Sequence, residues 1–383
     1  MTAKTIYLIA TEESGDRLGA ALIRALRGRM QDGLTFRGIG GRAMTNEGIA
    51  SPFPIDELSI IGFAAVVKQL PMLLRRIGAA ADAVLAAKPD LLVIIDSPDF
   101  THRVARRVRA TNPAIKIVNY VSPTVWAWRP GRAAKMRGYV DHILALLPFE
   151  PEAHRRLGGP PCTYVGHPLT EQIATLRPDA SEQRRREATP PVLLVLPGSR
   201  RGEIRHHMAV FGDTLGRLRD DGIAFDAVLP TMPHLRDAVI DAVKTWPVQP
   251  RIAIGEDEKR AAFRVAHAAL AKSGTVTLEL AIAGVPMVTA YRGGAVEAFI
   301  AKRVVKLTSV ILANLVIGDT VIPEYLQQDC AANKLAPALR DVLTDTALRR
   351  RQLIAFARLD AIMATGEVSP SGKAAEVVVG LLG

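Results

Sequence analysis

Short apolar runs alternate with longer amphipathic stretches along most of the chain, and this alternation constrains the fold more than any other feature. The clearest case is residues 192–204, where an aliphatic run stops at Pro197-Gly198 and a polar, doubly basic turn leads into a helical pattern. Buried parallel strands read as continuous apolar runs, and strands that alternate with helices build doubly wound parallel sheets. With 383 residues, the sequence predicts an α/β fold with two such Rossmann-like domains.

The predicted strands fall into two groups separated by a polar, arginine-rich segment. This segment, residues 171–191, is bounded by prolines, and we interpret it as the linker region. The strands expected before it are residues 5–10, 36–41, 91–95, 115–120 and 142–146. Those expected after it are residues 192–196, 224–229, 251–254, 268–271 and 286–289. The chain beyond Asn333 is expected to be helical.

Charge and composition restrict the classes of partner that the protein is expected to bind. The formal net charge of +11 predicts an anionic partner, whereas the low aromatic content of 5% and the dispersed charge argue against nucleic acid. Two cysteines, Cys162 and Cys330, are too few for a disulfide framework. Residues 1–10 show no signal-peptide pattern, and no apolar run reaches about twenty residues. We therefore expect a cytoplasmic protein.

Two basic and apolar segments, residues 58–80 and 299–315, have the composition of helices that lie in a membrane interface. An ordinary core helix explains the first of them equally well.

The turn at residues 197–201 is the strongest candidate for an anion site. Ser199 is expected to cap the following helix, and Arg200 and Arg201 add positive charge where the helix dipole already favours an anion. A second such helix start follows Lys272, with Ser273 or Thr275 as its cap. Glu279 lies on the same helical face as Thr275 and is able to bind a ribose hydroxyl, unless that face is simply solvated.

Asp96 is the candidate general base of the first half. It stands at the carboxyl end of a predicted buried strand, where open α/β sheets bind their ligands. A partly desolvated carboxylate there suits proton abstraction near neutral pH, and bracing of the loop is the alternative. Asp99 is expected to cap the next helix. After the first strand, Ser14 is the expected N-cap and Asp16 lies in the first helical turn, while no cap explains Glu12.

A proline-bounded loop at residues 121–132 contains two of the three tryptophans, Trp126 and Trp128, close to basic residues. This loop favours a groove for apolar or sugar rings, and packing between domains is the competing explanation.

These features together describe a nucleotide-sugar glycosyltransferase with two Rossmann-like domains, and specific motifs strengthen that interpretation. The sequence resembles the lipid-A-disaccharide synthase family, whose members have the GT-B fold with two domains facing a central cleft. The resemblance covers nearly the whole chain, and the motifs that carry it are Ser14-Gly15-Asp16, Asp96-Ser97-Pro98-Asp99-Phe100, Tyr120-Val121-Ser122-Pro123, Val125-Trp126-Ala127-Trp128-Arg129, Leu147-Pro148-Phe149-Glu150, Gly166-His167, Leu196-Pro197-Gly198-Ser199-Arg200, Ser273-Gly274-Thr275 with Glu279, and Tyr291-Arg292.

The resemblance implies an inverting transfer of 2,3-diacylglucosamine from its UDP derivative to 2,3-diacylglucosamine 1-phosphate, which gives the β(1→6) disaccharide precursor of lipid A and UDP without a metal or cofactor. It implies that Asp96 is the base, that Arg200 binds the UDP diphosphate, and that Ser273, Gly274, Thr275 and Glu279 form the uridine-nucleotide pocket. Further substrate contacts are expected from Glu12, Ser14, Asp16, Ser122, Trp126, Trp128, Ser199, Tyr291, Arg292 and Asn314.

The resemblance also implies an organisation and a location. Residues 1–168 form the acceptor domain and residues 169–345 the UDP-sugar domain, and helices in residues 346–383 pack back on the first domain or exchange within a homodimer. Acylated substrates imply peripheral association with the cytoplasmic face of the inner membrane.

Three positions depart from the family pattern: Thr11 replaces a glycine, Ala313 a proline and Asp319 an arginine. The alternatives are another GT-B N-acetylglucosaminyltransferase with a lipid-linked acceptor, and a non-catalytic basic membrane-binding protein.

Overall fold

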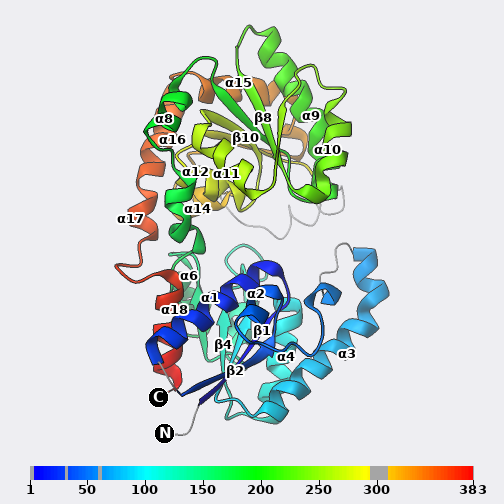
Figure 1. The fold of residues 1–383 in the computed structure, drawn as a ribbon, viewed down its shortest axis with the longest axis vertical. Helices are drawn as coiled ribbons and strands as arrows, with labels where there is room; N and C mark the ends of the chain where they lie inside the picture. Colours follow the sequence, from blue (N-terminus) through cyan, green and yellow to red (C-terminus); the bar gives the residue numbers. More distant parts are fainter. Residues whose placement is uncertain (1–3, 31–32, 59–62, 294–308, 383) are drawn as a thin grey trace. The chain divides into compact units, whose positions relative to one another are not determined.

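The computed structural model describes residues 4–30, 33–58, 63–293 and 309–382, and the chain divides into two compact units. Unit 1 comprises Met1–Pro168 and Met363–Gly383, and unit 2 comprises Leu169–Ile362. Each unit contains a six-stranded sheet in which every pair of neighbouring strands is parallel (Figure 1). The predicted α/β fold with two doubly wound parallel sheets is confirmed.

The sheet of unit 1 has the strand order β2-β1-β3-β4-β5-β6. Its strands are β1 (Lys4–Ala10), β2 (Leu34–Ile39), β3 (Leu91–Ile95), β4 (Lys116–Tyr120), β5 (His142–Ala145) and β6 (Cys162–Tyr164). Its helices are α1 (Glu13–Met30), α2 (Arg42–Asn46), the short η1 (Ile55–Leu58), α3 (Phe63–Ala87), α4 (Pro98–Thr111), α5 (Gly131–Met136), α6 (Glu150–Arg156) and α18 (Pro370–Leu382). The sequence did not predict β6, which has only three residues.

Both faces of this sheet are covered, because successive side chains of a strand point to opposite faces. Ile6 and Leu8 of β1 pack with residues of α1 and α18 on one face. Tyr7 and Ile9 pack with α3 and α4 on the other face. Burial on both faces explains why these strands read as unbroken apolar runs in the sequence.

The C-terminal helix α18 returns to unit 1 and lies beside α1 (Figure 1). Arg29 forms an ion pair with Glu376 at 2.6 Å, and the Tyr164 hydroxyl donates to the Met363 carbonyl at 2.8 Å. The return begins at Met363, so that residues 346–362 group with unit 2. Gln352 accounts for this grouping, since its buried amide exchanges hydrogen bonds with the backbone of Met287.

The sheet of unit 2 has the order β12-β11-β10-β7-β8-β9. Its strands are β7 (Val192–Leu196), β8 (Asp226–Thr231), β9 (Arg251–Ile254), β10 (Ala268–Lys272), β11 (Met287–Tyr291) and β12 (Glu324–Leu326). Its helices are α7 (Ile173–Leu176), α8 (Ala180–Glu187), α9 (Arg201–Asp220), α10 (Arg236–Val243), α11 (Glu256–Val265), α12 (Val276–Ile282), α14 (Leu312–Ile317), α15 (Ala332–Leu343) and α16 (Ala347–Ala357). Short 3-10 turns are η2 (Pro168–Gln172), η3 (Pro233–Leu235) and η4 (Gln327–Asp329), and α17 (Leu359–Met363) precedes the return to unit 1.

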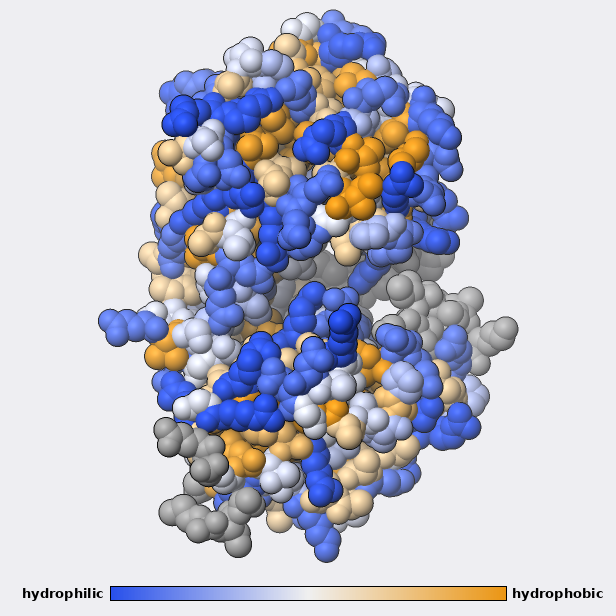
Figure 2. Space-filling view, viewed as in Figure 1, coloured by the Kyte–Doolittle hydropathy of each residue, from blue (hydrophilic) through white to orange (hydrophobic). Residues whose placement is uncertain are grey.

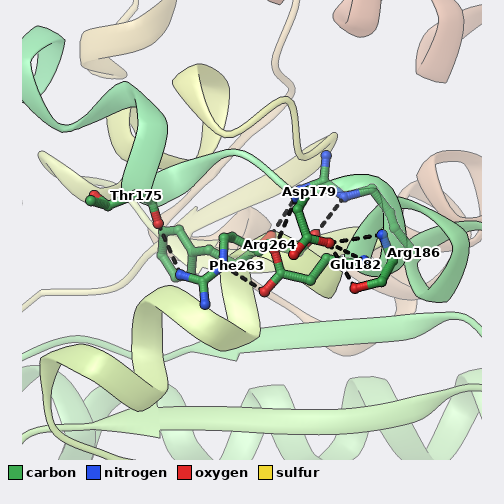
Figure 3. Close-up of polar contacts among 7 residues, drawn as sticks. Thr175, Asp179, Glu182, Arg186, Phe263 and Arg264 are labelled. Carbon is green, nitrogen blue, oxygen red and sulfur yellow. Dashed lines mark hydrogen bonds and ion pairs between the residues drawn. The ribbon is translucent and has the colours of Figure 1, made fainter.

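The predicted linker at residues 171–191 is wrong, because this segment is a folded part of unit 2. It contains α7 and α8, and Asp179 and Glu182 form a capping box at the start of α8. The buried Arg186 donates to the carbonyls of Phe263, Ala283 and Arg264. Figure 3 draws Arg186 together with Asp179, Glu182 and Arg264. A charged side chain that satisfies three buried carbonyls is part of a packed structure, although its residue type suggested solvent exposure.

Three predicted N-caps are also wrong. Helix α1 begins at Glu13, so Ser14 lies inside its first turn, and α4 begins at Pro98, so Asp99 lies inside the first turn of that helix. Helix α9 begins at Arg201 and Arg200 occupies its N-cap position, one residue beyond Ser199.

No helix in the described parts of the chain is long and apolar enough to cross a membrane. Figure 2 shows a mostly hydrophilic surface with scattered hydrophobic patches on the face in view. Of the two segments expected at a membrane interface, residues 59–62 of the first and residues 299–308 of the second lie outside the described residues.

Candidate active site

The sheet of unit 2 changes its winding direction between β7 and β10. From β7 the chain continues to β8 and β9 on one side, and β10 to β12 lie on the other side. Ligands of open α/β sheets bind outside the carboxyl ends of the strands at this switch point. The two candidate motifs of the second half, residues 197–201 and 272–275, are the loops that leave these two strands.

Both loops line one cavity of about 350 Å³. Five of the predicted site residues line it: Ser199, Arg200, Gly274, Thr275 and Glu279. The ends of β8 and β9 add Thr231, Met232 and Gly255, which the sequence analysis did not single out. This volume is typical of a small-molecule site.

The cations of the cavity differ in whether they have a partner. Lys272 pairs with Glu203 at 2.9 Å, and Lys259 pairs with Glu279 at 2.6 Å. Burial alone would raise the pKa of Glu203, but Lys272 and the Ser199 N–H outweigh burial and lower it. Arg200 is exposed and forms no ion pair with any described carboxylate, so its charge is available to an anionic ligand.

Gly198 lets the loop fold closely over the start of α9. Its φ of 131° lies in a region that favours glycine, and a Cβ there would come within 2.5 Å of the Glu203 side chain. This close approach allows Glu203 to accept a hydrogen bond from the Ser199 N–H at 2.9 Å. Gly198 therefore permits the turn, and the hydrogen bond from Ser199 to Glu203 holds the backbone next to Arg200.

Two buried hydroxyls at this edge of the sheet have no hydrogen-bond partner within the described residues, Thr231 Oγ1 and Ser273 Oγ. Thr231 lines the cavity, and Ser273 is next to the cavity-lining Gly274. Buried polar atoms are usually paired, so the two hydroxyls offer hydrogen bonds to a ligand.

Tyr291 and Arg292 lie at the end of β11, beside this cavity rather than on its wall. Lys272 Nζ lies 5.6 Å from the centre of the Tyr291 ring. His207 links the loop to α9, because its Nδ1 bonds to the Glu203 carbonyl at 2.8 Å and its Nε2 accepts from the Arg292 N–H at 3.0 Å. Burial lowers the pKa of His207, which favours the neutral ring that this arrangement requires.

Asn314 is buried and its amide group is occupied by protein atoms. Its Oδ1 accepts from the Val321 and Ile322 N–H groups, and its Nδ2 donates to the Ile322 carbonyl. These bonds give Asn314 the role of bracing the loop between α14 and β12. In that loop Asp319, the departure from the family pattern, binds Arg351 with both carboxylate oxygens at 2.9 Å.

The corresponding switch point of unit 1 lies between β1 and β3. Asp96 follows β3 directly, is partly exposed, and has a φ of 52°. Ser97, with a φ of 44°, donates to Glu12 Oε1 at 3.4 Å, so the loops after both strands meet here. Two consecutive left-handed residues other than glycine are strained, and such strain is typical of functional sites. Thr101 holds the strained turn by donating to the Asp96 carbonyl at 2.6 Å.

Asp16 serves the local structure. Its two carboxylate oxygens accept hydrogen bonds from the backbone N–H groups of Gly41, Ala43 and Met44, and the side chain is almost fully buried. The carboxylate thereby satisfies the first N–H groups of α2. Ser14 lies exposed at the start of α1.

The loop with the two tryptophans is anchored at one of them. Trp126 Nε1 donates to the buried Glu150 at 3.2 Å, and its ring packs edge-on against Phe149. Ser122 bonds to His154 at 2.8 Å. Burial raises the pKa of Glu150 to about 7 and lowers that of His154 to about 4.

Trp128 lies on the surface of the same loop. It is 36% exposed, its Nε1 donates to Thr124 at 2.9 Å, and the Arg129 guanidinium stacks 4.2 Å from its ring centre. The loop therefore presents a partly exposed aromatic ring beside two cations, Arg129 and Arg132.

Comparison with known proteins identifies the family to which the chain belongs. The model of a family described as lipid-A-disaccharide synthetase matches residues 6–376. The chain belongs to this family. A lipid-A-disaccharide synthase of Rhodopseudomonas palustris is 70% identical over 99% of this chain and 96% of its own length, and one of Bradyrhizobium diazoefficiens is 68% identical over 98% and 96%. One of Rhodospirillum centenum is 42% identical over 98% of this chain and 94% of its own length.

Solved structures share the fold at low identity. A UDP-GlcNAc 2-epimerase from Neisseria meningitidis bound to UDP-GlcNAc has a TM-score of 0.61, 12% identity and 99% coverage of both chains. A calicheamicin glycosyltransferase has a TM-score of 0.61 and 16% identity, and covers 100% of this chain and 99% of its own. These similarities show the GT-B fold, and the predicted resemblance to the lipid-A-disaccharide synthase family is confirmed.

Sequence reasoning missed Lys272, Lys259, Glu203 and Thr231 at the cavity. Lys272 directly precedes the Ser273 motif, so its position at a strand end was a usable signal. Lys259 and Thr231 reach the cavity from other elements, and only the folded sheet brings them there. Within the described ranges, no group of three or more His, Cys, Asp or Glu residues is arranged to hold a metal ion.

Proposed function

We propose that the chain transfers 2,3-diacylglucosamine from its UDP derivative to the 6-hydroxyl of 2,3-diacylglucosamine 1-phosphate. The products are the β(1→6) disaccharide 1-phosphate and UDP. Membership of the lipid-A-disaccharide synthase family over nearly the whole chain supports this activity. The observation that carries the assignment of the donor site is the cavity at the switch point of unit 2, with an arginine that has no described carboxylate partner.

The reaction is a single displacement. Asp96 removes the proton from the acceptor hydroxyl, whose oxygen attacks the anomeric carbon of the donor as the bond from that carbon to the diphosphate breaks. One displacement inverts the anomeric carbon, and the proton remains on Asp96 until solvent takes it. The strained turn held by Thr101 supports the role of Asp96, because it fixes the carboxylate at the strand end.

Arg200 stabilises the negative charge that develops on the departing UDP. A fixed cation that gains interaction energy as charge accumulates lowers the barrier. Ser199, Gly274 and Thr275 are proposed to contact the phosphates or the ribose, and Glu279, held by Lys259, is proposed to accept a hydrogen bond from a ribose hydroxyl. The unpaired Thr231 and Ser273 hydroxyls support further contacts to the nucleotide.

The remaining predicted site residues are proposed to contact the acceptor or to lie at the edges of the donor site. Glu12 and Ser14 are proposed to accompany Asp96, and the partly exposed ring of Trp128 is proposed to contact a sugar ring. Tyr291 and Arg292 border the donor cavity. Asp16, Ser122, Trp126 and Asn314 act by holding these surfaces in place.

Acylated substrates require access to a membrane surface, and α3 is the proposed contact in unit 1. Leu70 and Leu74, one helical turn apart, are 43% and 48% exposed, and Arg75 follows them. The double variant Leu70→Asp/Leu74→Asp should lose binding to vesicles that contain phosphatidylglycerol. Ile354→Asp, which alters an exposed apolar residue of α16 in unit 2, is the matched control and should retain it.

The activity is tested with purified protein, detergent, the acylated UDP-sugar and the acylated sugar phosphate. We expect UDP and disaccharide 1-phosphate in equal amounts. Transfer only from UDP-N-acetylglucosamine to another lipid-linked acceptor would support the alternative transferase, and binding without any transfer would support a non-catalytic protein. A homodimer, which the resemblance also implies, is tested by light scattering of the same preparation.

A further inference from the structure

A second cavity lies in unit 1, next to the loop that carries Asp96. Its volume is about 400 Å³, and its walls are the beginning of α4 and the segment from Arg129 into α5. Pro98, the first residue of α4, lines this cavity two residues after Asp96. A group bound there would therefore be held close to the proposed base.

The cavity is strongly basic. Its charged lining residues are Arg103, Arg106, Arg129, Arg132, Lys135 and the single carboxylate Asp99. Asp99, Arg103 and Arg106 stand three and four positions apart on α4 and share one helical face, as Arg132 and Lys135 do on α5. Such a concentration of like charge is unfavourable without a counter-charge.

Only one of these cations has an acidic partner among the described residues. Arg132 lies 3.3 Å from Asp99. Arg103, Arg129 and Lys135 form no ion pair with a described carboxylate, which contrasts with the paired Lys272 and Lys259 of the donor cavity.

Three of the guanidinium groups lie over aromatic rings, and one of them is Arg132, 5.7 Å from the centre of the Trp128 ring. Arg106 stacks 4.7 Å from the centre of the Tyr139 ring and donates to its hydroxyl at 3.2 Å. Arg129 stacks over Trp128. A stacked guanidinium keeps N–H groups in its plane free for bidentate hydrogen bonds to an oxyanion.

His102 also lines the cavity, and the positive charges of the cavity affect its pKa. Its ring is buried and bonds to Tyr139 and Asn119. Burial is the largest cause that lowers the pKa of His102 to about 4, and the charges of Arg132 and Arg106 lower it further. His102 is therefore neutral, and the cavity's charge comes from its arginines and Lys135.

We propose that this cavity binds a phosphate monoester, the 1-phosphate of the acceptor sugar. The inference rests on the proposed function, since it assigns a place to the acceptor's own charge. A doubly negative phosphate matches several unpaired cations, and holding it beside the Asp96 loop would orient the acceptor hydroxyl toward the base. The chain would then have separate sites for two phosphate groups: the donor diphosphate in unit 2 and the acceptor monoester in unit 1.

The test uses the double variant Arg103→Ala/Lys135→Ala, because neither side chain has a described acidic partner whose loss would disturb the fold. Arg137→Ala, at an exposed position at the end of α5 outside the cavity lining, is the matched control. We expect KM for the acceptor phosphate to rise at least ~10-fold in the double variant, as expected for lost charge-assisted hydrogen bonds. KM for the UDP-sugar should stay within about twofold, the range of an uninvolved surface change.

The same variants are assayed with 2,3-diacylglucosamine that lacks the 1-phosphate. Wild type should use this acceptor poorly, and the double variant should use it as well as wild type does. An equal rise in KM for both acceptors, or the same rise in Arg137→Ala, would overturn the proposal. So would a double variant that loses binding to phosphatidylglycerol vesicles while its acceptor KM is unchanged, since the cavity would then bind lipid headgroups.

A direct binding measurement separates this inference from the activity itself. Glucosamine 1-phosphate is titrated calorimetrically into wild type and the double variant, with UDP as the second ligand. Binding weakened by ~10-fold for the sugar phosphate alone supports the site even if no disaccharide forms. Equal affinities of the two proteins for the sugar phosphate would contradict the site even if wild type makes disaccharide.

Discussion

Each sheet reverses its winding direction beside its first strand, yet the residues at the two switch points differ in charge. In unit 1 the loops after β1 and β3 provide the carboxylates Glu12 and Asp96, and in unit 2 the loop after β7 provides Arg200 and the end of β10 provides Lys272. The strand ends determine where a ligand binds, and the loop residues determine which chemistry takes place. Carboxylates suit proton removal from an acceptor, whereas cations suit a departing diphosphate.

Two glutamates, the buried Glu150 of unit 1 and the partly buried Glu203 of unit 2, also differ in their surroundings. Burial raises the pKa of Glu150 in unit 1 to about 7, and the hydrogen bonds that it accepts from Trp126 and from the Leu147 N–H only partly offset this effect. Glu203 in unit 2 is also partly buried, but Lys272 and the Ser199 N–H lower its pKa. Glu150 therefore has no cation among the described residues to offset its burial, whereas Glu203 forms an ion pair with Lys272.

The largest expected effect comes from Asp96→Asn. The amide keeps the shape of the loop but cannot accept the proton, so turnover should fall by ~10²–10⁴-fold, the usual contribution of a general base. The measurement is kcat at saturating concentrations of both substrates. Unchanged turnover would remove Asp96 from the reaction, and a loss confined to KM would make it a binding residue.

Arg200→Ala should reduce both turnover and affinity for the donor. Loss of a charge-assisted contact to the diphosphate is expected to raise KM for the UDP-sugar ~10- to 100-fold and to lower kcat, since the leaving group becomes more negative in the transition state. Arg201→Ala removes the neighbouring charge of the same loop and is the natural control. If both variants behaved alike, the loop would act only through its total charge.

The two glutamates predict opposite dependences of stability on pH. Between its ordinary pKa of 4.5 and its folded value of about 7, Glu150 holds a proton in the folded state that the unfolded state has released. Raising the pH through this window should therefore lower the unfolding free energy, by up to about 1.4 kcal/mol per pH unit. The pKa of Glu203 is lowered, so this residue stabilises the folded state at pH values above its ordinary pKa of 4.5. That stabilisation is lost only as the pH falls below this value.

Urea unfolding of wild type, Glu150→Gln and Glu203→Gln between pH 4 and 8 checks these signs. Glu150→Gln should remove part of the decline between pH 4.5 and 7, and Glu203→Gln should leave that decline intact. An identical decline in wild type and Glu150→Gln would show that the carboxylate is ionised throughout the range.

Arg201→Ala carries the smallest expected effect. Its side chain is exposed and has no ion-pair partner among the described residues. Both kcat and KM should stay within about twofold of wild type. A larger change would place Arg201 in the donor site beside Arg200.

The sequence predicted most strands of the two sheets. Strands that are buried on both faces appear as continuous apolar runs, which differ from the alternating pattern of a half-buried strand and from the helical pattern. It missed β6 and β12, which have three residues each, and took residues 171–191 for a linker because Arg186 and its neighbours look solvent-exposed. The three carbonyls that bind the buried arginine come from distant parts of the chain, so no local sequence pattern predicts this burial.

The candidate sites divide in the same way. Residues in loops that directly follow strands, such as Asp96, Arg200 and Thr275, could be identified from position alone. Lys259, Arg103 and Arg106 lie on helical faces outside those motifs, and only packing brings them to the cavities. Asp16 and Asn314 form hydrogen bonds to the backbone that the sequence did not predict.

The division of labour between the two switch points is tested most directly by the dissociation constant of UDP, measured by calorimetry for wild type, Asp96→Asn and Arg200→Ala. If unit 2 binds the nucleotide and unit 1 supplies the base, Arg200→Ala should raise the dissociation constant of UDP at least ~10-fold. Asp96→Asn should leave this constant within about twofold of the wild-type value. Equal weakening in both variants, or unchanged affinity in Arg200→Ala, would contradict this division.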